Sequence, residues 1–198
     1  MHPRKCARWV GLSLISLSLM CIVANALLLV PDGKTWSSDQ LSLQVLLMPG
    51  FIGGGLMVLC LGISVVREAN DYDCPVRSQL KRDLLMSLRF CVIIGLLGAI
   101  YCLTVSAEGL RIGPKCSMNG VWDYYFQRDE YLSYPDDWNF CEEPSNVVSW
   151  NVTLFSLLVV ASSLEILLSC SYSNLRSAVF SLFSIQWWRQ LIEPWRDI

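Results

Sequence analysis

The sequence is poor in histidine and in charge, and both shortages limit what the protein can do. His2 is the single histidine among 198 residues, and it lies at the amino terminus. Histidine-based catalysis and histidine-ligated zinc are therefore not expected. Charged residues make up 16%, the net charge is −2, and no continuous basic face could neutralise the phosphates of a nucleic acid. No nucleophile–base constellation is present either, so the sequence predicts no enzyme, no cofactor and no nucleic-acid partner.

Apolar residues, by contrast, are abundant. They make up 54% of the chain, and the mean hydropathy is +0.44. About 20 helical residues cross roughly 30 Å of hydrocarbon, so long runs without charge predict transmembrane helices. Four such runs are present. We predict an all-α fold: a four-helix transmembrane bundle with a small disulfide-closed extracellular loop subdomain and an interfacial C-terminal helix.

The distribution of lysine and arginine predicts the orientation of these helices. Basic residues gather in the amino terminus, the middle connector and the tail, whereas the first external loop has one. Cytosolic loops carry the excess of positive charge. The predicted order is a cytosolic amino terminus (1–9), the first helix (10–30), a small extracellular loop (31–45), the second helix (46–66), a cytosolic loop (67–89), the third helix (90–107), a large extracellular loop (108–151), the fourth helix (152–170) and a cytosolic tail (171–198).

Two segments have alternative interpretations. A cleaved signal peptide would fit the first segment. Arg4, Lys5 and Arg8 precede an apolar run, and Ala24-Asn25-Ala26 would be the small-residue cleavage site. The run continues to Val30, which favours a retained helix. In the tail, only about 12 charge-free residues lie between Arg176 and Arg189, which is too few for a fifth transmembrane helix. The tail is instead predicted to form an amphipathic helix in the membrane interface.

The nine cysteines are sorted by their predicted depth. Only Cys116 and Cys141 share a watery loop, so they are predicted to form a disulfide, which persists in an oxidising compartment. Cys6, Cys74 and Cys170 are predicted to lie at the cytosolic boundary. This is the setting of S-palmitoylation, with ordinary free thiols as the alternative.

Small residues within two helices recur at a spacing of four. Gly50 and Gly54 form one such pair, and Gly95 and Ala99 form the other. In lipid these pairs let two helix backbones approach closely. We expect packing between helices of the same chain, with a homo-oligomer contact as the alternative.

Two polar residues, Asn25 and Glu165, are expected inside the membrane, where such groups are costly. Their depths differ by about 12 Å at 1.5 Å per helical residue, which argues against a direct bond between them. For Glu165 the expected partners are Ser16, Ser18 or Arg89. A structural polar clamp or a protonated carboxyl explains Glu165 better than an ion pathway.

The segment from Glu108 to Ser149 holds eight acidic and three basic residues, a net charge of −5. Aromatic rings beside carboxylates suit a cation, although a disulfide-closed core with solvated acids is the simpler interpretation. Protein recognition is compatible with either. The recognition candidates are Trp122, Asp123, Tyr124, Phe126, Asp129, Glu130 and Trp138.

Two short motifs lie next to the fourth helix. Asn151-Val-Thr153 is an N-glycosylation sequon on the predicted outer side, at the start of that helix. Tyr172-Ser-Asn-Leu175 fits a Tyr-x-x-apolar sorting signal, directly beside the membrane. Both are treated as hypotheses.

The combined motifs resemble the transmembrane four L-six family of tetraspan surface proteins over most of residues 4–170. The matching segments are Cys6-Ala-Arg8, Ile22–Pro31 with Gly33, Phe51–Cys60, Leu97–Cys102, Gly113-Pro-x-Cys116, Met118-Asn-Gly120, Trp122, Tyr124, Phe126, Tyr131-Leu132, Trp138, Cys141, Pro144, Val147-Val-x-Trp150 and Asn151–Ser156. The chain departs from the family in three places. The cysteine-rich cytosolic loop is reduced to Cys74, the family's Trp-Gly-Tyr-x-Phe becomes Trp122-Asp-Tyr-Tyr-Phe126, and the tail after Cys170 shows no match.

The resemblance implies a non-enzymatic scaffold in the plasma membrane, with endosomes or lysosomes as further locations. Members associate with membrane lipids, integrins, growth-factor receptors and tetraspanins, and affect adhesion, migration and growth signalling. Two alternatives remain. One is a lysosomal or surface sensor whose large loop binds a basic amino acid. The other is a claudin-like adhesion protein, although claudins carry their disulfide in the first extracellular loop.

Overall fold

The computed structural model describes residues 3–31, 40–71, 78–118, 120–126, 132, 138, 141, 143, 144 and 146–192, and for residues 3, 4, 71, 78–86 and 175–192 it describes the backbone alone. Cys74, Asp129 and Glu130 fall outside these ranges. The elements in order are α1 (Pro3–Leu28), α2 (Leu43–Leu46), the π-helix η2 (Pro49–Met57), α3 (Val58–Asp71), α4 (Ser78–Ile112), β1 (Cys116–Met118), β2 (Val121–Asp123) and α5 (Val147–Ile192).

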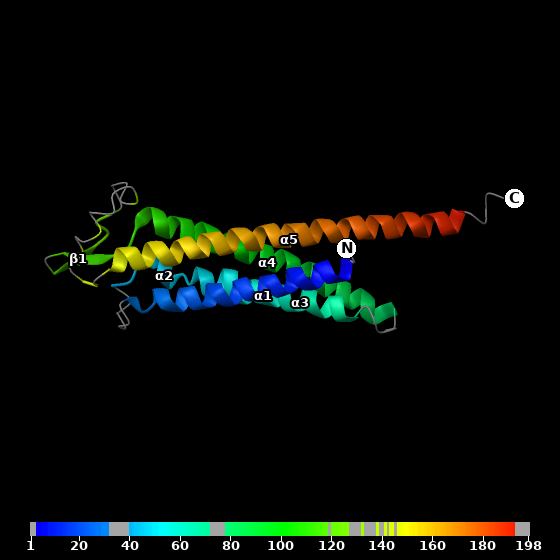
Figure 1. The fold of residues 1–198 in the computed structure, drawn as a ribbon, viewed down its shortest axis with the longest axis horizontal. Coiled ribbons are helices and arrows are strands. Elements are labelled where there is room, and N and C mark those ends of the chain that lie inside the picture. The colour runs from blue at the N-terminus through cyan, green and yellow to red at the C-terminus, as the bar shows by residue number, and fades with distance from the viewer. Residues whose placement is uncertain are drawn as a thin grey trace.

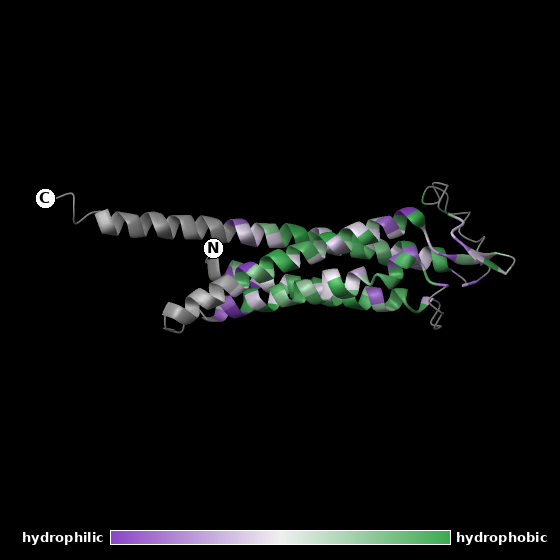
Figure 2. Cartoon of the chain, turned by 180° about the vertical axis from the view of Figure 1, so that it is seen from behind, coloured by the Kyte–Doolittle hydropathy of each residue, from purple (hydrophilic) through white to green (hydrophobic). Residues whose placement is uncertain are grey.

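Four long helical segments lie side by side and form one bundle (Figure 1). Within the described ranges, four stretches are long and apolar enough to cross a membrane: Lys5–Leu28, Leu43–Asn70, Ser87–Ile112 and Val147–Asn174. The predicted four-helix fold class is confirmed. Residues coloured hydrophobic fill the middle of the bundle, and hydrophilic residues gather toward its two ends (Figure 2).

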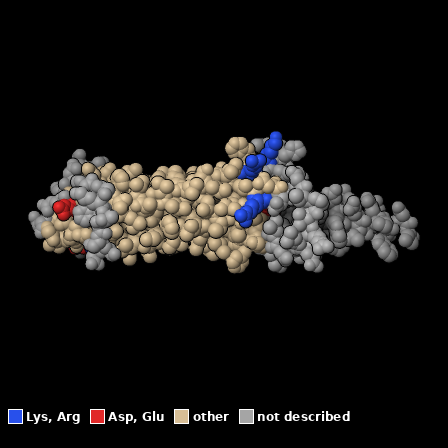
Figure 3. All heavy atoms as spheres, turned by 90° about the horizontal axis from the view of Figure 1, so that it is seen from below, with Lys and Arg blue, Asp and Glu red and all other residues tan. Residues whose placement is uncertain are grey.

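The two ends of the bundle differ in charge. On the face drawn in Figure 3, the described lysine and arginine side chains gather at the end where α1 begins, and acidic side chains lie at the opposite end, beside the hairpin. The middle of this face is free of charge. We call the end with the start of α1 the inner end and the end with the hairpin the outer end, following the orientation that the positive-inside rule predicts.

The second span is not a uniform α-helix. Met48 adopts φ 47°, and Pro49 begins the π-helical segment, where the missing N–H of proline costs nothing. The π-helix runs through the glycine-rich stretch and becomes the α-helix α3 at Val58. Wide helical turns of this kind occur often at functional sites. Pro49 therefore starts the π-helix.

α5 continues without a break from Val147 to Ile192, through the predicted cytosolic tail. At 1.5 Å per residue a helix of 46 residues is about 69 Å long, more than twice the hydrocarbon thickness. The tail thus prolongs the fourth spanning helix (Figure 1) and does not form a separate one. Its placement in the membrane interface stays a prediction.

The bundle has two apolar clusters, one nearer its outer end and one nearer its inner end. The outer cluster includes Cys21, Leu28, Phe155 and Leu158, from α1 and α5, with Cys102 of α4. The inner cluster joins α1, α3 and α4 with α5 through Leu14, Val58, Leu61, Leu88 and Tyr172. Each of the four spanning segments thus buries one face against the others, and the remaining faces expose large apolar side chains to lipid.

Candidate functional site

The outer end of the bundle carries a small folded unit, which we call the outer subdomain (residues 113–146). Gly113, with φ 79°, ends α4, and its N–H donates to Gly109 O over 3.1 Å. The antiparallel hairpin β1–β2 follows, with Cys116 opposite Asp123 and Ser117 opposite Trp122. Ser117 N also donates to Glu143 O over 2.9 Å, so β1 lies between β2 and the returning chain.

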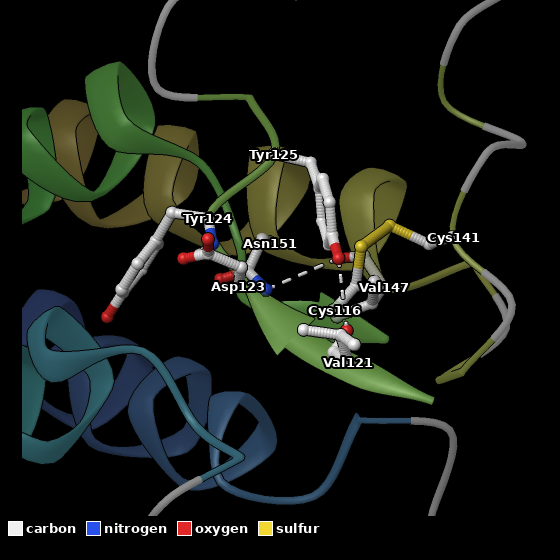
Figure 4. The surroundings of a disulfide bond; sticks show 8 residues. All are labelled: Cys116, Val121, Asp123, Tyr124, Tyr125, Cys141, Val147 and Asn151. Carbon is white, nitrogen blue, oxygen red and sulfur yellow. Dashed lines mark hydrogen bonds between the residues drawn. A yellow bond between two sulfur atoms is a disulfide. The ribbon is translucent and has the colours of Figure 1, made fainter. Parts of the chain in front are cut away.

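A disulfide joins Cys116 of β1 to Cys141, across 25 residues (Figure 4). This confirms the predicted pair. Cys116 is fully buried, and it packs with Phe126, Val147 and Val148. Trp138 packs partly buried against the same cluster. Phe126 and Trp138, which the sequence suggested as recognition residues, therefore belong to the core of the outer subdomain.

Three hydrogen bonds tie the outer segments to one another and to the helices. Leu43 N donates to the Tyr124 hydroxyl over 3.1 Å, which joins the hairpin to α2. The Trp150 indole Nε1 donates to Leu27 O over 3.0 Å, which joins the start of α5 to the end of α1. Trp150 N in turn donates to Asn146 O over 3.0 Å. Of these bonds, the one to Tyr124 joins the hairpin to the bundle, whereas those of Trp150 lie within α5 and between α5 and α1.

The exposed face of the outer subdomain is partly apolar. Val121 is 61% exposed, Leu132 48% and Tyr125 37%, and Asp123 is also exposed. The Tyr125 hydroxyl donates to Val121 O over 3.2 Å, which holds the ring beside the hairpin (Figure 4). We call Val121, Asp123 and Tyr125 the outer patch. Strand alternation could have identified Val121, because it shares a face of β2 with Asp123.

One aromatic ring beside the hairpin, that of Tyr124, already faces a cation. Lys115 Nζ lies 6.0 Å from the centroid of the Tyr124 ring, at the limit of a cation–π contact. The Tyr124 amide donates to Asp123 Oδ1 over 2.8 Å. Trp122 is half-buried. Among the described residues no group of three metal-ligating side chains is placed to hold a metal ion.

The bundle interior places the small residues between the helices of this one chain. A Cβ on Gly50 would stand 2.6 Å from Cys21 O, and one on Gly54 3.0 Å from Cys102 Sγ. A Cβ on Gly95 would stand 2.8 Å from Leu61 Cδ2, and Ala99 is fully buried. The two small-residue pairs are thus used within the bundle, which leaves them unavailable as a homodimer face.

Asn25 and Glu165 both have hydrogen-bond partners inside the bundle. The partner of Glu165 differs from those expected. Asn25 Oδ1 accepts from Gly50 N over 3.0 Å. Glu165 Oε1 accepts from Cys21 Sγ over 3.7 Å, and Glu165 is fully buried. The hydroxyls of Ser16 and Ser18 instead donate to carbonyls of their own helix, and Arg89 is exposed. The expected partners of Glu165 were wrong because Glu165 lies level with Cys21, about one turn along α1 from the buried Ser18, whose hydroxyl is taken up by its own helix.

Tyr172 also has a structural role. It is 4% exposed within the inner cluster, and its hydroxyl donates to the Glu68 carboxylate of α3. The tyrosine of the Tyr-x-x-apolar motif is thereby packed between helices and is not free to bind a sorting adaptor.

Comparison with known proteins identifies the family. The family described as L6 membrane protein matches residues 1–184. The chain belongs to this family. It is 64% identical to transmembrane 4 L6 family member 5 of Bos taurus over 167 residues and 58% identical to the Homo sapiens protein of that name over 168 residues, each match covering 83% of this chain and 85% of the relative. Transmembrane 4 L6 family member 1 of Homo sapiens is 38% identical over 172 residues, with the same two coverages. No solved structure matches.

The L6 match also corrects one expectation. The sequence motifs ended at Cys170, whereas the family match runs on to residue 184. This part of the tail therefore belongs to the family region, in agreement with the unbroken helix α5.

Acylation of this L6 protein is expected at the exposed cysteines of the inner end. Cys170 is exposed and Cys6 is half-buried, whereas Cys21 and Cys102 are fully buried. Since acylation requires an accessible thiol at the boundary, Cys170→Ser should remove a large share of the acyl-exchange signal. Cys102→Ser, the matched buried control, should leave it unchanged. Equal signals in wild type and Cys170→Ser would contradict this expectation.

Asn151 is expected to remain unglycosylated. It is 8% exposed, in the first turns of α5, and its Nδ2 donates to Val147 O over 3.3 Å (Figure 4). The nitrogen that would carry the sugar is thus engaged and buried. Treatment of the protein from mammalian cells with an amidase that removes N-glycans should not change its electrophoretic mobility, and Asn151→Gln should migrate as wild type does. A mobility shift present in wild type and lost in Asn151→Gln would contradict this expectation.

Proposed function

We propose that this L6 membrane protein is a non-enzymatic scaffold that organises integrins and growth-factor receptors, and through them affects adhesion, migration and growth signalling. The observation that carries the proposal is the outer patch. It is a partly apolar surface on a disulfide-closed subdomain, which the hydrogen bond between Leu43 and Tyr124 joins to the bundle. A rigid surface loses little conformational entropy when it binds a protein.

Lateral contacts support the same role. The helices expose large apolar side chains at the level of the membrane, including Ile93, Leu97 and Val160, which are 57–60% exposed. In lipid such faces pack against the acyl chains or against the helices of other membrane proteins. A scaffold of this kind needs no cavity and no cofactor, only surfaces. Its proposed location is the plasma membrane, and also endosomes or lysosomes.

Proximity labelling in intact cells tests the proposal. Val121→Asp places a charge at the most exposed position of the outer patch and removes no buried contact. We expect it to lower the labelling of integrins and growth-factor receptors about tenfold, as the loss of about 1.4 kcal/mol of binding free energy would. Glu108→Gln is the matched control, because this half-exposed carboxylate lies on α4, outside the patch. Equal labelling in wild type and Val121→Asp would contradict the proposal.

The sensor for a basic amino acid is less well supported. Lys115 already faces the Tyr124 ring, and the Asp123 carboxylate accepts a hydrogen bond from the backbone. A binding measurement separates the two functions: saturable arginine binding that is lost in Trp122→Ala and Asp123→Ala, with an unchanged set of labelled proteins, would favour the sensor over the scaffold.

A further inference from the structure

Three helices bring a carboxyl and two thiols together inside the bundle. Glu165 of α5 accepts a hydrogen bond from Cys21 of α1 over 3.7 Å. Cys102 of α4 lies close by: a Cβ on Gly54 would stand 3.1 Å from Cys21 Sγ and 3.0 Å from Cys102 Sγ. Glu165, Cys21 and Cys102 are all fully buried. We call these three residues the interior cluster.

The interior cluster lies deep in the membrane. Glu165 is about 13 residues, or roughly 20 Å, from the predicted outer end of its span, and hence on the order of 10 Å from the inner end. Ser162 of the same helix is buried beside it, but its hydroxyl donates to Leu158 O over 2.7 Å, in its own helix. Neither water nor lipid headgroups are therefore within easy reach of the carboxyl.

No positive charge compensates Glu165 among the described residues. The titratable groups that face it are the thiols of Cys21 on α1 and Cys102 on α4, and neither is a cation. The η2 segment contributes glycines to this region. Four other titratable side chains of the spans have surroundings of their own. Tyr101 donates to Leu47 O, Cys91 contacts Ser64, and Cys60 and Arg89 are exposed.

The hydrogen bonds of Glu165 are also too few for a carboxylate. One oxygen accepts from a thiol, which is a weak donor, and Oε2 has no hydrogen-bond partner in the described structure. A buried ionised carboxylate without a cation and without strong donors costs several kcal/mol or more, and such groups take up a proton instead. The geometry of the cluster thus suits a neutral acid.

We propose that Glu165 is a proton-binding site inside the bundle: its carboxyl holds a proton while α1, α4 and α5 are packed together and releases it only when α1 moves away from α5. Cys21 is the contact that α1 contributes, so separation of these two helices removes the donor and admits water at once. Release of the proton thereby reports that the bundle has opened, and the ionised carboxylate then opposes its re-closure. This role does not depend on the outer patch or on any receptor partner.

Infrared spectroscopy of the purified full chain in lipid nanodiscs tests the proton directly. At about pH 8 solvent-exposed carboxyls are ionised, so only a shielded carboxyl absorbs as the protonated form. Wild type should show a protonated-carboxyl C=O band that shifts in D2O and is absent from Glu165→Gln. Glu108→Gln, which removes an exposed acid, should keep the band. A wild-type spectrum without the band, or the same band in Glu165→Gln, would overturn the proposal.

A second variant covers the case that Glu165→Gln does not fold. Glu165→Asp keeps an acid and should displace the band without abolishing it, whereas an undisplaced band would assign the proton to another group and overturn the proposal.

Thermal unfolding in detergent tests the link to helix separation. In the opened state Glu165 faces water and is ionised between about pH 6 and pH 9, so rising pH should favour opening. The wild-type midpoint should fall by about 3–5 °C per pH unit, and that of Glu165→Gln should stay level. Cys102→Ala should retain the wild-type slope, which separates the carboxyl from the thiols. A slope that Glu165→Gln shares with wild type would contradict the link.

Discussion

Adding one methyl group at Gly53 is expected to destabilise the bundle by about 1–3 kcal/mol. A Cβ on Gly53 would stand 2.5 Å from Gly98 O, and one on Gly98 would stand 2.7 Å from Gly53 O. The backbones of η2 and α4 are thus in direct contact, and neither can yield as a flexible side chain would. Thermal unfolding of Gly53→Ala in detergent, read also by maleimide labelling of the buried thiol of Cys102, measures the loss.

The double variant sharpens this prediction. Gly53→Ala and Gly98→Ala disturb one shared contact, so their combined effect should be smaller than the sum of the two. Ile52→Ala is the control: its side chain is 42% exposed on the neighbouring position of η2, and the change should stay within about 0.5 kcal/mol. Additive effects, or a Gly53→Ala protein as stable as wild type, would show that the two backbones tolerate greater separation.

Replacing both disulfide cysteines, as Cys116→Ser with Cys141→Ser, is expected to unfold the outer subdomain and leave the bundle intact. The bond closes 25 residues, which is worth about 3–4 kcal/mol in the chain-entropy model. The small core of Phe126, Val147 and Val148 offers little to replace it. Limited proteolysis should cut the double variant within residues 113–146 at least tenfold faster than wild type, since 1.4 kcal/mol already corresponds to a factor of ten.

Two further measurements define the limits of that effect. The helical circular dichroism of the double variant should match wild type, because Cys116 and Cys141 lie outside the four spans. Cys60→Ser, at an exposed free thiol of α3, is the control and should keep the wild-type cleavage rate. Unchanged proteolysis of the double variant would show that the Tyr124 hydrogen bond and the packing of Phe126 suffice to hold the outer subdomain.

The π-helix of the second span could not be predicted from the local sequence. The spacing of Gly50 and Gly54 predicted close helix packing, but it did not predict the π-helix that the chain forms over Pro49–Met57. Glycine propensity does not predict a wide turn. Within the π-helix, Gly50 and Gly53 pack closely against Cys21 O of α1 and Gly98 O of α4. These neighbours are distant in sequence, so their contact is a property of the packed bundle.

The aromatic residues of the large loop make the same point. Phe126 and Tyr125 are adjacent and similar in composition, but Phe126 is 6% exposed in the core and Tyr125 is 37% exposed in the outer patch. Composition alone assigned Phe126 to recognition and did not single out Tyr125. Their roles depend on the position of the disulfide and of β2, which together decide the face on which each ring lies.

The sequence by itself determined the four spans, the disulfide and the family. Hydropathy and chain length act residue by residue, and Cys116 and Cys141 were the only cysteines in water, so no knowledge of packing was required. The tertiary structure alone decided the partner of Glu165, the core role of Phe126, the burial of Tyr172 and the continuation of α5 through the tail. Each depends on how far one helix is rotated and tilted against another, which is a balance of many contacts along whole helices and is not encoded in any short segment.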